Sequence, residues 1–525
     1  MKHILFKRET LIDQLKANIN WDVIIIGGGA TGLGVALDCV TRGYKTLLLE
    51  QVDFAKGTSS RSTKLVHGGV RYLAQGNIDL VREALYERGL MLQNASHLVS
   101  NQSFIIPNYK WWDNFFYTVG LKVYDFLAGK LSFGKSVRIK KNETISRLST
   151  LKTDSLKGGV VYHDGQFDDS RLAVNIAQSC IEYGGTVLNH FKVKNLQKNE
   201  LGKVSGVIAI DTETNTEYAL NAKVVVNATG VFSDEVLQMD NKDAENSIRP
   251  SQGIHLVFDK SFLPGNDAIM IPKTDDGRVL FLVPWHNRVV VGTTDTLLDS
   301  HSLEPKPLDK EIDFVLETAN RYLNKKANKE DVLSIFAGLR PLAEPKDKSE
   351  KTKEISRSHK IIVSDSELVS ITGGKWTTYR RMAQDTVNKI IDLNKLPKAN
   401  CKTQGLKIHG SSGSVDRTNH LYIYGTDQKG IEELIKENPS FGDKLHERLE
   451  FTKAEVIWAV RHEMARSIED VLARRVRVLF LDAKAAIEMA PMVGELLRSE
   501  LNETNDWKSA QISEFIEIAD QYILK

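Results

Sequence analysis

Residues 22–50 read DVIIIGGGATGLGVALDCVTRGYKTLLLE, and this stretch decides the fold. The opening DVIII predicts a buried parallel strand, because it is an apolar run that ends at glycine. It leads directly into a G-x-G-x-x-G turn, which is followed by apolar residues at helical spacing and an Arg-Gly pair typical of a helix end. KTLLLE then predicts a second strand that ends in Glu50, so the stretch forms a complete βαβ unit.

The glycines and the closing acid have the spacing of a dinucleotide-binding turn. Gly27 allows the tight turn, Gly29 lets backbone N–H groups approach a pyrophosphate, and Gly32 lets the helix pack closely on the strand. The helix N-terminus favours the anion. Glu50 would accept hydrogen bonds from ribose hydroxyls and repel a 2′-phosphate, which disfavours NADP. A glycine turn without a ligand is the weaker alternative, because strand, helix and acid all match.

Residues 57–73, GTSSRSTKLVHGGVRYL, favour FAD over NAD as the dinucleotide. Hydroxyl side chains and backbone donors crowd directly after the ribose-binding strand, where an extended flavin would run. An NAD domain would normally continue with a simple helix and strand. We therefore expect a flavin cofactor beside this segment.

The composition excludes several classes of protein. The chain has 525 residues and a net charge of +2, so we expect no nucleic-acid partner. Cys39, Cys180 and Cys401 make no CxxC pair, which excludes a disulfide framework and a zinc ribbon. The charged N-terminus and the lack of an apolar run long enough for a bilayer predict an intracellular protein, soluble or attached peripherally to a membrane.

A series of motifs carries a resemblance to a known family. They are GGGATG at 27–32, GTSSRSTKLVHGGVRYL at 57–73, DGQFDDSRL at 164–172, VVNATG at 225–230, VGTTD at 291–295, AGLRPL at 337–342 and GGKWTTYR at 373–380. In this order they resemble the FAD-dependent glycerol-3-phosphate dehydrogenases of the quinone-linked, aerobic type, within the D-amino-acid-oxidase-like flavoprotein superfamily. The resemblance covers about residues 20–380, and the remainder resembles the family's C-terminal helical domain.

The resemblance implies an α/β fold with three parts. A Rossmann-type FAD-binding domain is assembled from separated stretches of residues 20–395. The same region holds a mixed-sheet substrate domain, formed mainly by 236–335 with part of 100–165. Residues 396–525 are expected to form a C-terminal helical domain.

The C-terminal region also reads as helical without the resemblance. Thr452 and Glu455 have the spacing of a capping box, and apolar residues at helical spacing from 456 to 471 predict one helix. His462 begins an incomplete HExxH pattern, because Arg466 stands where the second zinc ligand belongs. We therefore expect no metal site.

The resemblance also implies which residues bind the cofactor. They are Gly27, Gly28, Gly29, Ala30, Thr31 and Gly32 of the first turn, then Glu50, Thr58, Ser59, Ser60, Lys64, His67, Gly68 and Gly69, then Val193, Ala228, Thr229 and Gly230, and finally Gly374, Lys375, Trp376 and Thr377.

The implied reaction is the oxidation of sn-glycerol 3-phosphate to dihydroxyacetone phosphate, in which hydride passes from C2 to flavin N5. The substrate phosphate is nearly a dianion, so several cations should converge on it. By motif, the substrate-binding residues are Arg71, Tyr72, His255, Arg340 and Lys375.

Two of these residues are also the expected catalytic groups. Arg340 keeps its proton at all ordinary pH values, so it would stabilise developing alkoxide charge. His255 has an ordinary pKa near 6.5, so a neutral fraction exists at pH 7 and it is the expected base. His67 is the rival base, and a structural hydrogen bond is its alternative role.

The reduced flavin needs an electron acceptor, and the family suggests membrane quinone or dioxygen. Oxidases of this kind carry an insertion, and the stretch 296–336 leaves no room for one, which favours quinone. The aromatic and basic stretch 110–131 suits an inner-leaflet lipid surface, although a core-facing aromatic cluster is the slightly favoured interpretation. We expect a peripheral protein on the cytoplasmic face of a bacterial inner membrane, and a homodimer is compatible with the sequence.

Three other functions remain open at this stage. An oxidase would act on the same substrate and release peroxide. A flavin-binding protein without turnover would not need the cations Arg71, Arg340 and Lys375. An amino-acid oxidase of the same superfamily would need one carboxylate-binding arginine rather than a cluster of cations.

Overall fold

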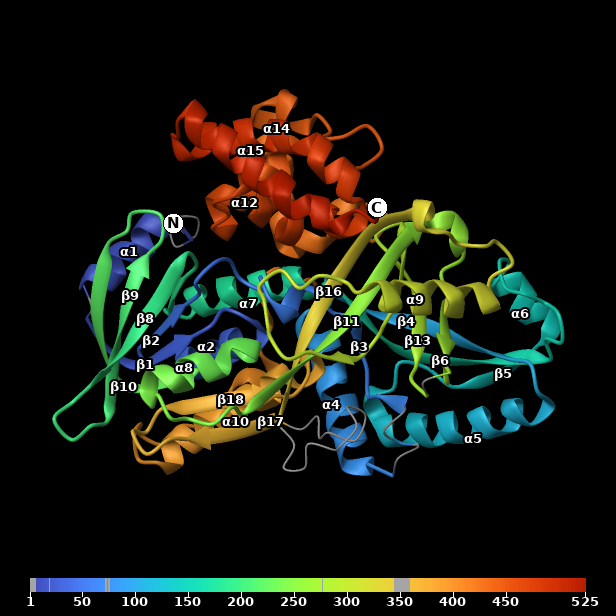
Figure 1. Cartoon of the computed structure of the whole chain (residues 1–525), viewed down its shortest axis with the longest axis horizontal. Helices are drawn as coiled ribbons and strands as arrows, with labels where there is room; N and C mark the ends of the chain where they lie inside the picture. The colour runs from blue at the N-terminus through green and yellow to red at the C-terminus, as the bar shows by residue number, and fades with distance from the viewer. Residues whose placement is uncertain (1–5, 18, 71–72, 74–75, 276, 344–358) are drawn as a thin grey trace.

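The computed structural model describes residues 6–17, 19–70, 73, 76–275, 277–343 and 359–525. Two mixed β-sheets lie side by side, and the C-terminal helices lie above both of them in Figure 1. Parts of the chain that are far apart in sequence therefore meet between the sheets.

The first sheet is built around the predicted βαβ unit. Its strands are β1 (Asn20–Ile26), β2 (Thr46–Leu49), β7 (Thr186–Leu188), β8 (Phe191–Lys198), β9 (Val204–Asp211), β10 (Glu217–Asn227), β17 (His359–Val363) and β18 (Val369–Gly373). The order is β17-β18-β10-β1-β2-β7, with β8 and β9 extending from β10. The four strands β18, β10, β1 and β2 run parallel, as does β7, so their carboxyl ends meet at one edge.

Three helices pack together around this sheet. They are α2 (Ala30–Arg42), α7 (Asp169–Glu182) and α10 (Tyr379–Asp392). Helix α2 ends where predicted, since Gly43 has φ 95° and its N–H bonds back to the last turn. A Cβ atom on Gly34 would lie 2.9 Å from the ring of Tyr379, so glycine is needed for the close packing of α2 on α10. Helix α1 (Arg8–Ala17) covers the edge near β7.

The second sheet forms the other half of the molecule. Its strands are β3 (Leu65–Val66), β4 (Val99–Asn108), β5 (Val137–Lys140), β6 (Gly158–Phe167), β11 (Ile248–Asp259), β12 (Ala268–Ile271), β13 (Leu280–Trp285), β14 (Arg288–Gly292), β15 (Thr296–Leu297) and β16 (Val332–Ala343). The long strands β11 and β16 pair antiparallel from Ile248 to Phe258. The sheet also uses Leu65–Val66 and runs on to Ala343, so it extends beyond the expected 236–335 and 100–165.

Further helices surround these sheets. They are α4 (Ile78–Asn94), α5 (Trp111–Ala128), α6 (Lys141–Arg147), α8 (Ser233–Asp240), α9 (Asp309–Tyr322), α11 (Gln428–Glu437), α12 (Lys453–Glu463), α13 (Val478–Leu481), α14 (Ala483–Leu501) and α15 (Asn505–Ala519). The prediction of an α/β fold with a Rossmann-type unit, a mixed sheet and a helical C-terminal part is confirmed. Within the described residues, no helix is both long and apolar enough to cross a bilayer.

The prediction of one helix across residues 456–471 is wrong. Helix α12 begins with the predicted capping interaction, in which the Glu455 carboxylate accepts from the Thr452 N–H at 2.7 Å, but it ends at Glu463. Met464 then has φ 54°, and the chain turns before a short π-helical segment at Asp470–Arg475. Beyond this turn, Arg474 and Arg475 pair with the carboxylate of Asp53, and Arg477 pairs with that of Asp169.

Helix α5 also differs from expectation. Its aromatic side chains were expected to face the core, but Phe115, Phe116 and Phe126 are mostly exposed. Leu121 and Tyr124, on the other side of the helix, are buried against the second sheet and α4. The helix is therefore anchored by one face and presents an apolar face outward.

Buried ion pairs join the C-terminal segment to the first sheet. Arg474 and Arg475 both bond to the buried carboxylate of Asp53, at 2.5 and 2.8 Å. Arg171 of α7 makes two bonds, of 2.6 and 2.8 Å, to the carboxylate of Glu463 at the end of α12. Removing one partner of such a pair leaves a charge buried without compensation.

Replacing Arg171 with Ala should lower the free energy of unfolding by about 3–5 kcal/mol, because the Glu463 carboxylate would stay buried without the partner that makes two bonds to it. The measurement is urea denaturation of the variant beside the parent protein. The matched control is Arg461→Ala, which breaks an equally bidentate pair with Glu500 whose side chains are 42% and 18% exposed. We expect a loss below about 1 kcal/mol there. Equal losses of stability in the two variants would contradict the expectation that the buried ion pair contributes more to the free energy of unfolding than the exposed one.

Candidate functional site

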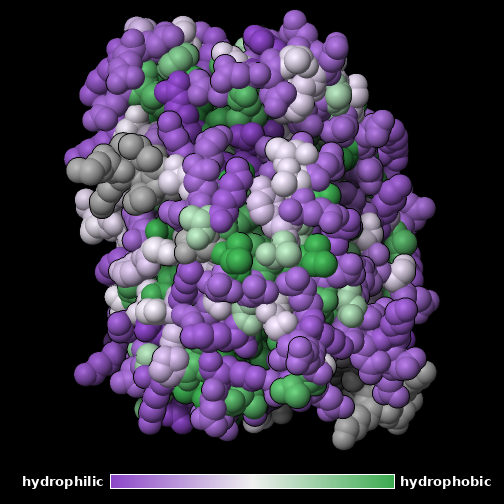
Figure 2. Space-filling model, turned by 90° about the vertical axis from the view of Figure 1, so that its left-hand side faces the viewer, coloured by the Kyte–Doolittle hydropathy of each residue, from purple (hydrophilic) through white to green (hydrophobic). Residues whose placement is uncertain are grey.

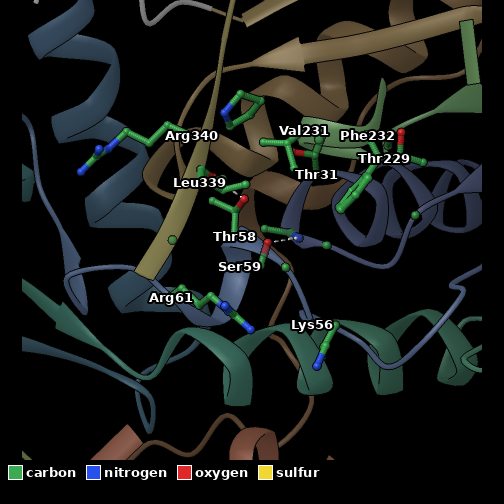
Figure 3. Close-up of a pocket in the computed structure, with 18 of the residues that line it drawn as sticks. Thr31, Lys56, Thr58, Ser59, Arg61, Thr229, Val231, Phe232, Leu339 and Arg340 are labelled. Carbon is green, nitrogen blue, oxygen red and sulfur yellow. Dashed lines mark hydrogen bonds between the residues drawn. The ribbon is translucent and has the colours of Figure 1, made fainter. Parts of the chain in front are cut away.

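A cavity of about 370 Å³ lies where the glycine turn, the end of β10 and the middle of β16 meet. Its walls include most of the predicted site residues: Gly27, Gly29, Ala30, Thr31, Glu50, Thr58, Ser59, His67, Val193, Ala228, Thr229, Gly230, His255, Arg340, Gly374, Lys375, Trp376 and Thr377. In Figure 3, Thr229 and Phe232 lie on one side of this cavity and Arg340 on the other, with Thr58 and Ser59 between them. We call it the cofactor cavity.

The glycine turn provides backbone groups at one end of the cofactor cavity. Gly27 has φ 107°, and a Cβ atom on Gly32 would lie 1.9 Å from the Gly27 carbonyl oxygen. Gly29 caps α2 without a side-chain acceptor, so the helix N-terminus faces the cavity. The hydroxyl of Ser59 accepts from the Ala30 N–H at 2.9 Å and ties the next loop to this turn. The result is a helix N-terminus bordered by hydroxyls, a kind of site that favours anions.

Glu50 lies at the end of β2, beside the glycine turn. Its carboxylate accepts hydrogen bonds from the N–H groups of Gly28, at 2.6 Å, and Val52, at 2.9 Å. Burial raises the pKa of Glu50, and the two backbone donors oppose that effect. The carboxylate is thus held in one orientation on the cavity wall, where it can accept from a hydroxyl group.

The far end of the cofactor cavity is formed by residues 373–377 and the loop after Ser59. Gly373 and Gly374 have φ 73° and 76°, so the chain turns sharply after β18. The indole of Trp376 donates to the Ser59 carbonyl at 2.9 Å, and the Thr377 hydroxyl accepts from the His67 N–H at 3.3 Å. These bonds join two segments that are far apart in the sequence.

Some predicted cofactor residues are not on this wall. Gly28, Gly32, Ser60, Lys64 and Gly68 lie behind it. The side chain of Lys64 is fully buried and bonds to the Ser60 carbonyl at 2.6 Å and to Asp169 at 2.8 Å. Lys56 and Arg61 line the cavity although they were not predicted, and Figure 3 shows their side chains directed away from Thr229.

A second cavity, of about 200 Å³, adjoins the first. Residues on both walls are Thr63, Leu65, His67 and Arg340. Gly69, predicted to bind the cofactor, lines this second cavity instead. Its polar wall also carries Arg278 and Asp295, and its apolar wall carries aromatic rings of the second sheet. We call it the substrate cavity.

Arg340 projects from β16 at the junction of the two cavities. Its guanidinium bonds to the Asp295 carboxylate at 3.4 Å, to the Thr294 carbonyl at 3.1 Å and to the Thr293 hydroxyl at 3.3 Å. These contacts hold the guanidinium in place while a quarter of the side chain stays exposed. A cation so oriented suits recognition of a planar or anionic oxygen group.

His255 lies on β11, and its side chain is almost completely buried. The Nε2 atom is 2.9 Å from the Thr63 hydroxyl. Burial, followed by the charges of Lys64 and Arg340, lowers the pKa of His255 well below its usual value. The ring is therefore neutral at pH 7 and has a nitrogen lone pair that can accept a proton.

Arg71 and Tyr72 lie outside the described residues, so the structure places neither of these two predicted substrate-binding groups. Lys375 lines the cofactor cavity. The sequence motifs did not identify Arg278 or Asp295 as cavity residues, or the contact between the Thr63 hydroxyl and His255. Thr63 lies within the 57–73 motif, but a single hydroxyl among several carries no pattern that distinguishes it.

Two family profiles match the chain. One describes FAD-dependent oxidoreductases and covers residues 22–380. The other describes the C-terminal domain of alpha-glycerophosphate oxidase and covers residues 364–511. Both parts of the fold therefore have counterparts in one group of flavoproteins.

Individual relatives agree with these profiles. The mitochondrial glycerol-3-phosphate dehydrogenases of Rattus norvegicus and Bos taurus are 39% and 38% identical, over 98% of this chain and 75% of each relative. Among solved structures, the glycerol-3-phosphate dehydrogenase of Bacillus halodurans, complexed with FAD, matches with a TM-score of 0.80 and 27% identity. That match covers 99% of this chain and 98% of the other.

Proposed function

Since the chain belongs to the family of FAD-dependent oxidoreductases that includes the glycerol-3-phosphate dehydrogenases, we propose that it oxidises sn-glycerol 3-phosphate to dihydroxyacetone phosphate. The observation that carries this proposal is the junction of the two cavities. There Arg340, a cation, and Thr63 lie on both walls, and the neutral ring of His255 is 2.9 Å from the Thr63 hydroxyl on the wall of the proposed cofactor cavity.

The residues of the cofactor cavity fit FAD. The N-terminus of α2 and the glycine turn suit a pyrophosphate, and the oriented carboxylate of Glu50 suits ribose hydroxyls. Val193, at the other wall, suits the adenine end, and residues 373–377 suit the ring system. When bound, FAD supplies the hydride acceptor, and this chain supplies orientation, charge and a proton acceptor.

The substrate cavity suits a small phosphate ester. Arg278 and Arg340 offer two guanidinium groups to the phosphate, and Lys375 lies on the adjoining wall. Arg71 and Tyr72 complete the proposed substrate-binding set by their motif. Each charge-assisted hydrogen bond contributes about 1.5–3 kcal/mol, so loss of the phosphate should abolish binding.

His255 is the proposed base. In the free protein burial and two cations hold its pKa low, but a bound phosphate dianion would offset those cations and make the ring more basic. A ring nitrogen of His255 would then take the proton from the C2 hydroxyl as hydride leaves C2. Arg340, held by Asp295, would stabilise the negative charge that develops on the oxygen.

The proposed domain division follows the sequence interpretation. Residues 20–395 form the oxidoreductase region, with 236–335 as the main part of its substrate domain, and 396–525 form the helical domain. The profile matches at 22–380 and 364–511 support a boundary close to this position.

Quinone is the proposed electron acceptor, and an oxidase that uses dioxygen is the alternative. A quinone dissolved in a bilayer requires a protein surface that enters the lipid interface. Helix α5 supports such a surface, because its outward face carries Trp112, Phe115, Phe116, Val119, Val123 and Phe126. Exposed lysines lie around it at 110, 122, 130 and 135, and basic residues favour anionic lipid.

The position of α5 in the molecule supports the same proposal. In Figure 1 it lies at the lower right, far from β8, β9 and β10. Figure 2 shows the face at the opposite end, which is mostly hydrophilic with small separate groups of hydrophobic residues. We propose that α5 attaches the protein to the cytoplasmic face of a bacterial inner membrane.

Glycerol 3-phosphate should bleach the flavin absorbance of the holoprotein under anaerobic conditions, whereas glycerol should not, because it lacks the phosphate. Absorbance near 450 nm is the measurement, followed by reoxidation with a soluble quinone or with dioxygen. Rapid reoxidation by quinone with little peroxide supports the dehydrogenase. Stoichiometric peroxide in air would establish the oxidase instead, and a yellow protein that no substrate bleaches would point to a binding protein without turnover.

Replacing His255 with Ala should slow anaerobic flavin reduction by about 10²–10⁴-fold, because the proton acceptor is lost. Substrate affinity should change little, so the effect belongs to the maximal rate. In the parent protein the ring loses its accepting form only when protonated, and the pKa of His255 is lowered. At low substrate concentration, where the pKa of the free protein governs, the rate should therefore stay constant near pH 7 and fall only below about pH 6.5. A variant that changes only the apparent substrate affinity would refute the base assignment.

Replacing both Phe115 and Phe126 with Glu should reduce pelleting with anionic vesicles by about tenfold or more, because the apolar face loses its two most exposed side chains. The matched control is Leu201→Glu, which alters a residue that is 81% exposed in the turn between β8 and β9. We expect the control to pellet like the parent protein. Equal pelleting by all three proteins would contradict the proposal that α5 contacts the lipid.

A further inference from the structure

The hydroxyl of Thr63 lies at the junction of the cofactor cavity and the substrate cavity. Thr63 lines both cavities, and its side chain is partly exposed rather than packed into the core. Its Oγ1 atom is 2.9 Å from Nε2 of His255. A packing role alone would not require a hydroxyl at this position.

The His255 ring is otherwise held by apolar contacts. It stacks on the ring of Phe336, with centroids 4.8 Å apart and an interplanar angle of 18°. Gly292, paired with His255 across the strands, leaves space for the ring, since a Cβ atom there would lie 2.3 Å from its Cδ2 atom. Among the described residues, Thr63 is the hydrogen-bond partner of the ring, and Nδ1 is buried without one.

The backbone around Thr63 is fixed on both sides. Ser62 bonds to the Asp169 carboxylate through its N–H, at 3.1 Å, and its hydroxyl, at 2.7 Å. Lys64, on the other side, bonds to the same carboxylate at 2.8 Å. Asp169 is itself held by Arg477 at 2.8 Å. The hydroxyl of Thr63 therefore occupies a defined position relative to β11.

We propose that Thr63 is a positioning residue whose hydroxyl holds Nε2 of His255 in the orientation needed for proton transfer from the substrate. This inference rests on the proposed function. A hydroxyl suits the task because its oxygen accepts from Nε2–H in both the neutral and the protonated ring, which leaves the lone pair of Nδ1, the nitrogen without a described partner, to take the proton of the C2 hydroxyl. The ring thus keeps one hydrogen bond through the proton transfer and does not have to rotate.

Three single variants test the proposal. Thr63→Val keeps the shape but removes the hydroxyl, and we expect anaerobic flavin reduction to slow by about 10- to 100-fold, within the range of general base catalysis. Thr63→Ser restores the hydroxyl and should stay within about threefold of the parent rate. Thr386→Val is the matched control, because Thr386 is buried in α10 and, within the described part of the chain, its hydroxyl donates to the Met382 carbonyl of the same helix. It should react at the parent rate.

A double-mutant cycle separates positioning from a general structural effect. If Thr63 acts through His255, then Thr63→Val in a His255→Ala background should cause no further loss of rate. Binding of dihydroxyacetone phosphate, followed by the change in the flavin spectrum, should be nearly the same in Thr63→Val and the parent. FAD content and melting temperature should also be unchanged, which shows that the cavities are intact.

Any of three results would overturn the proposal. They are a parent-like rate for Thr63→Val, a Thr63→Ser variant as slow as Thr63→Val, or losses that multiply fully in the double variant. Failure of the proposed function has a different signature, because the parent protein would then not be bleached by glycerol 3-phosphate at all.

Discussion

The buried carboxylate of Asp169 is the contact on which the site depends. It accepts hydrogen bonds from Ser62 and Lys64 of the cofactor loop and from Arg477 of the C-terminal segment. Its own residue begins α7, which packs against α2. Three parts of the chain far apart in sequence therefore meet at one charge. Because removing this carboxylate would leave two buried cations, Lys64 and Arg477, without it, the contact holds the cofactor loop against the C-terminal segment.

This arrangement directs the side chain of Lys64 into the interior, and its position there affects the pKa of His255. Its ammonium group cannot reach the cofactor cavity, yet its charge adds to burial in lowering the pKa of His255. Burial also lowers the pKa of Lys64 itself to about 7, against the attraction of Asp169. The histidine is kept neutral before substrate arrives, and an anionic substrate would then favour its protonated form. In the proposed mechanism, Arg340 would both bind the phosphate and help to keep the proposed base neutral until the substrate arrives.

The second sheet connects the two proposed surfaces of the enzyme. Phe104 and Tyr162 line the substrate cavity, and they belong to the same apolar cluster as Leu121, on the buried face of α5. Helix α5 is therefore fixed to the strands that carry the substrate cavity. A lipid-bound helix at this position would hold the flavin site near the membrane surface while the cavities remain formed by the protein alone.

The sequence by itself determined the βαβ unit, the glycine turn with Glu50, and most of the cofactor-cavity wall, because those features depend on local spacing and on backbone geometry that only glycine allows. It could also predict a helical C-terminal region, but not the end of α12 at Glu463, where Met464 adopts a left-handed conformation inside an unbroken apolar pattern. The packing of distant segments determined that Lys64 faces Asp169, that Thr63 meets His255, and that α5 presents Phe115, Phe116 and Phe126 outward. Each of these depends on which surface packs against which, and a residue's spacing along the chain carries no information about a partner a hundred or more residues away.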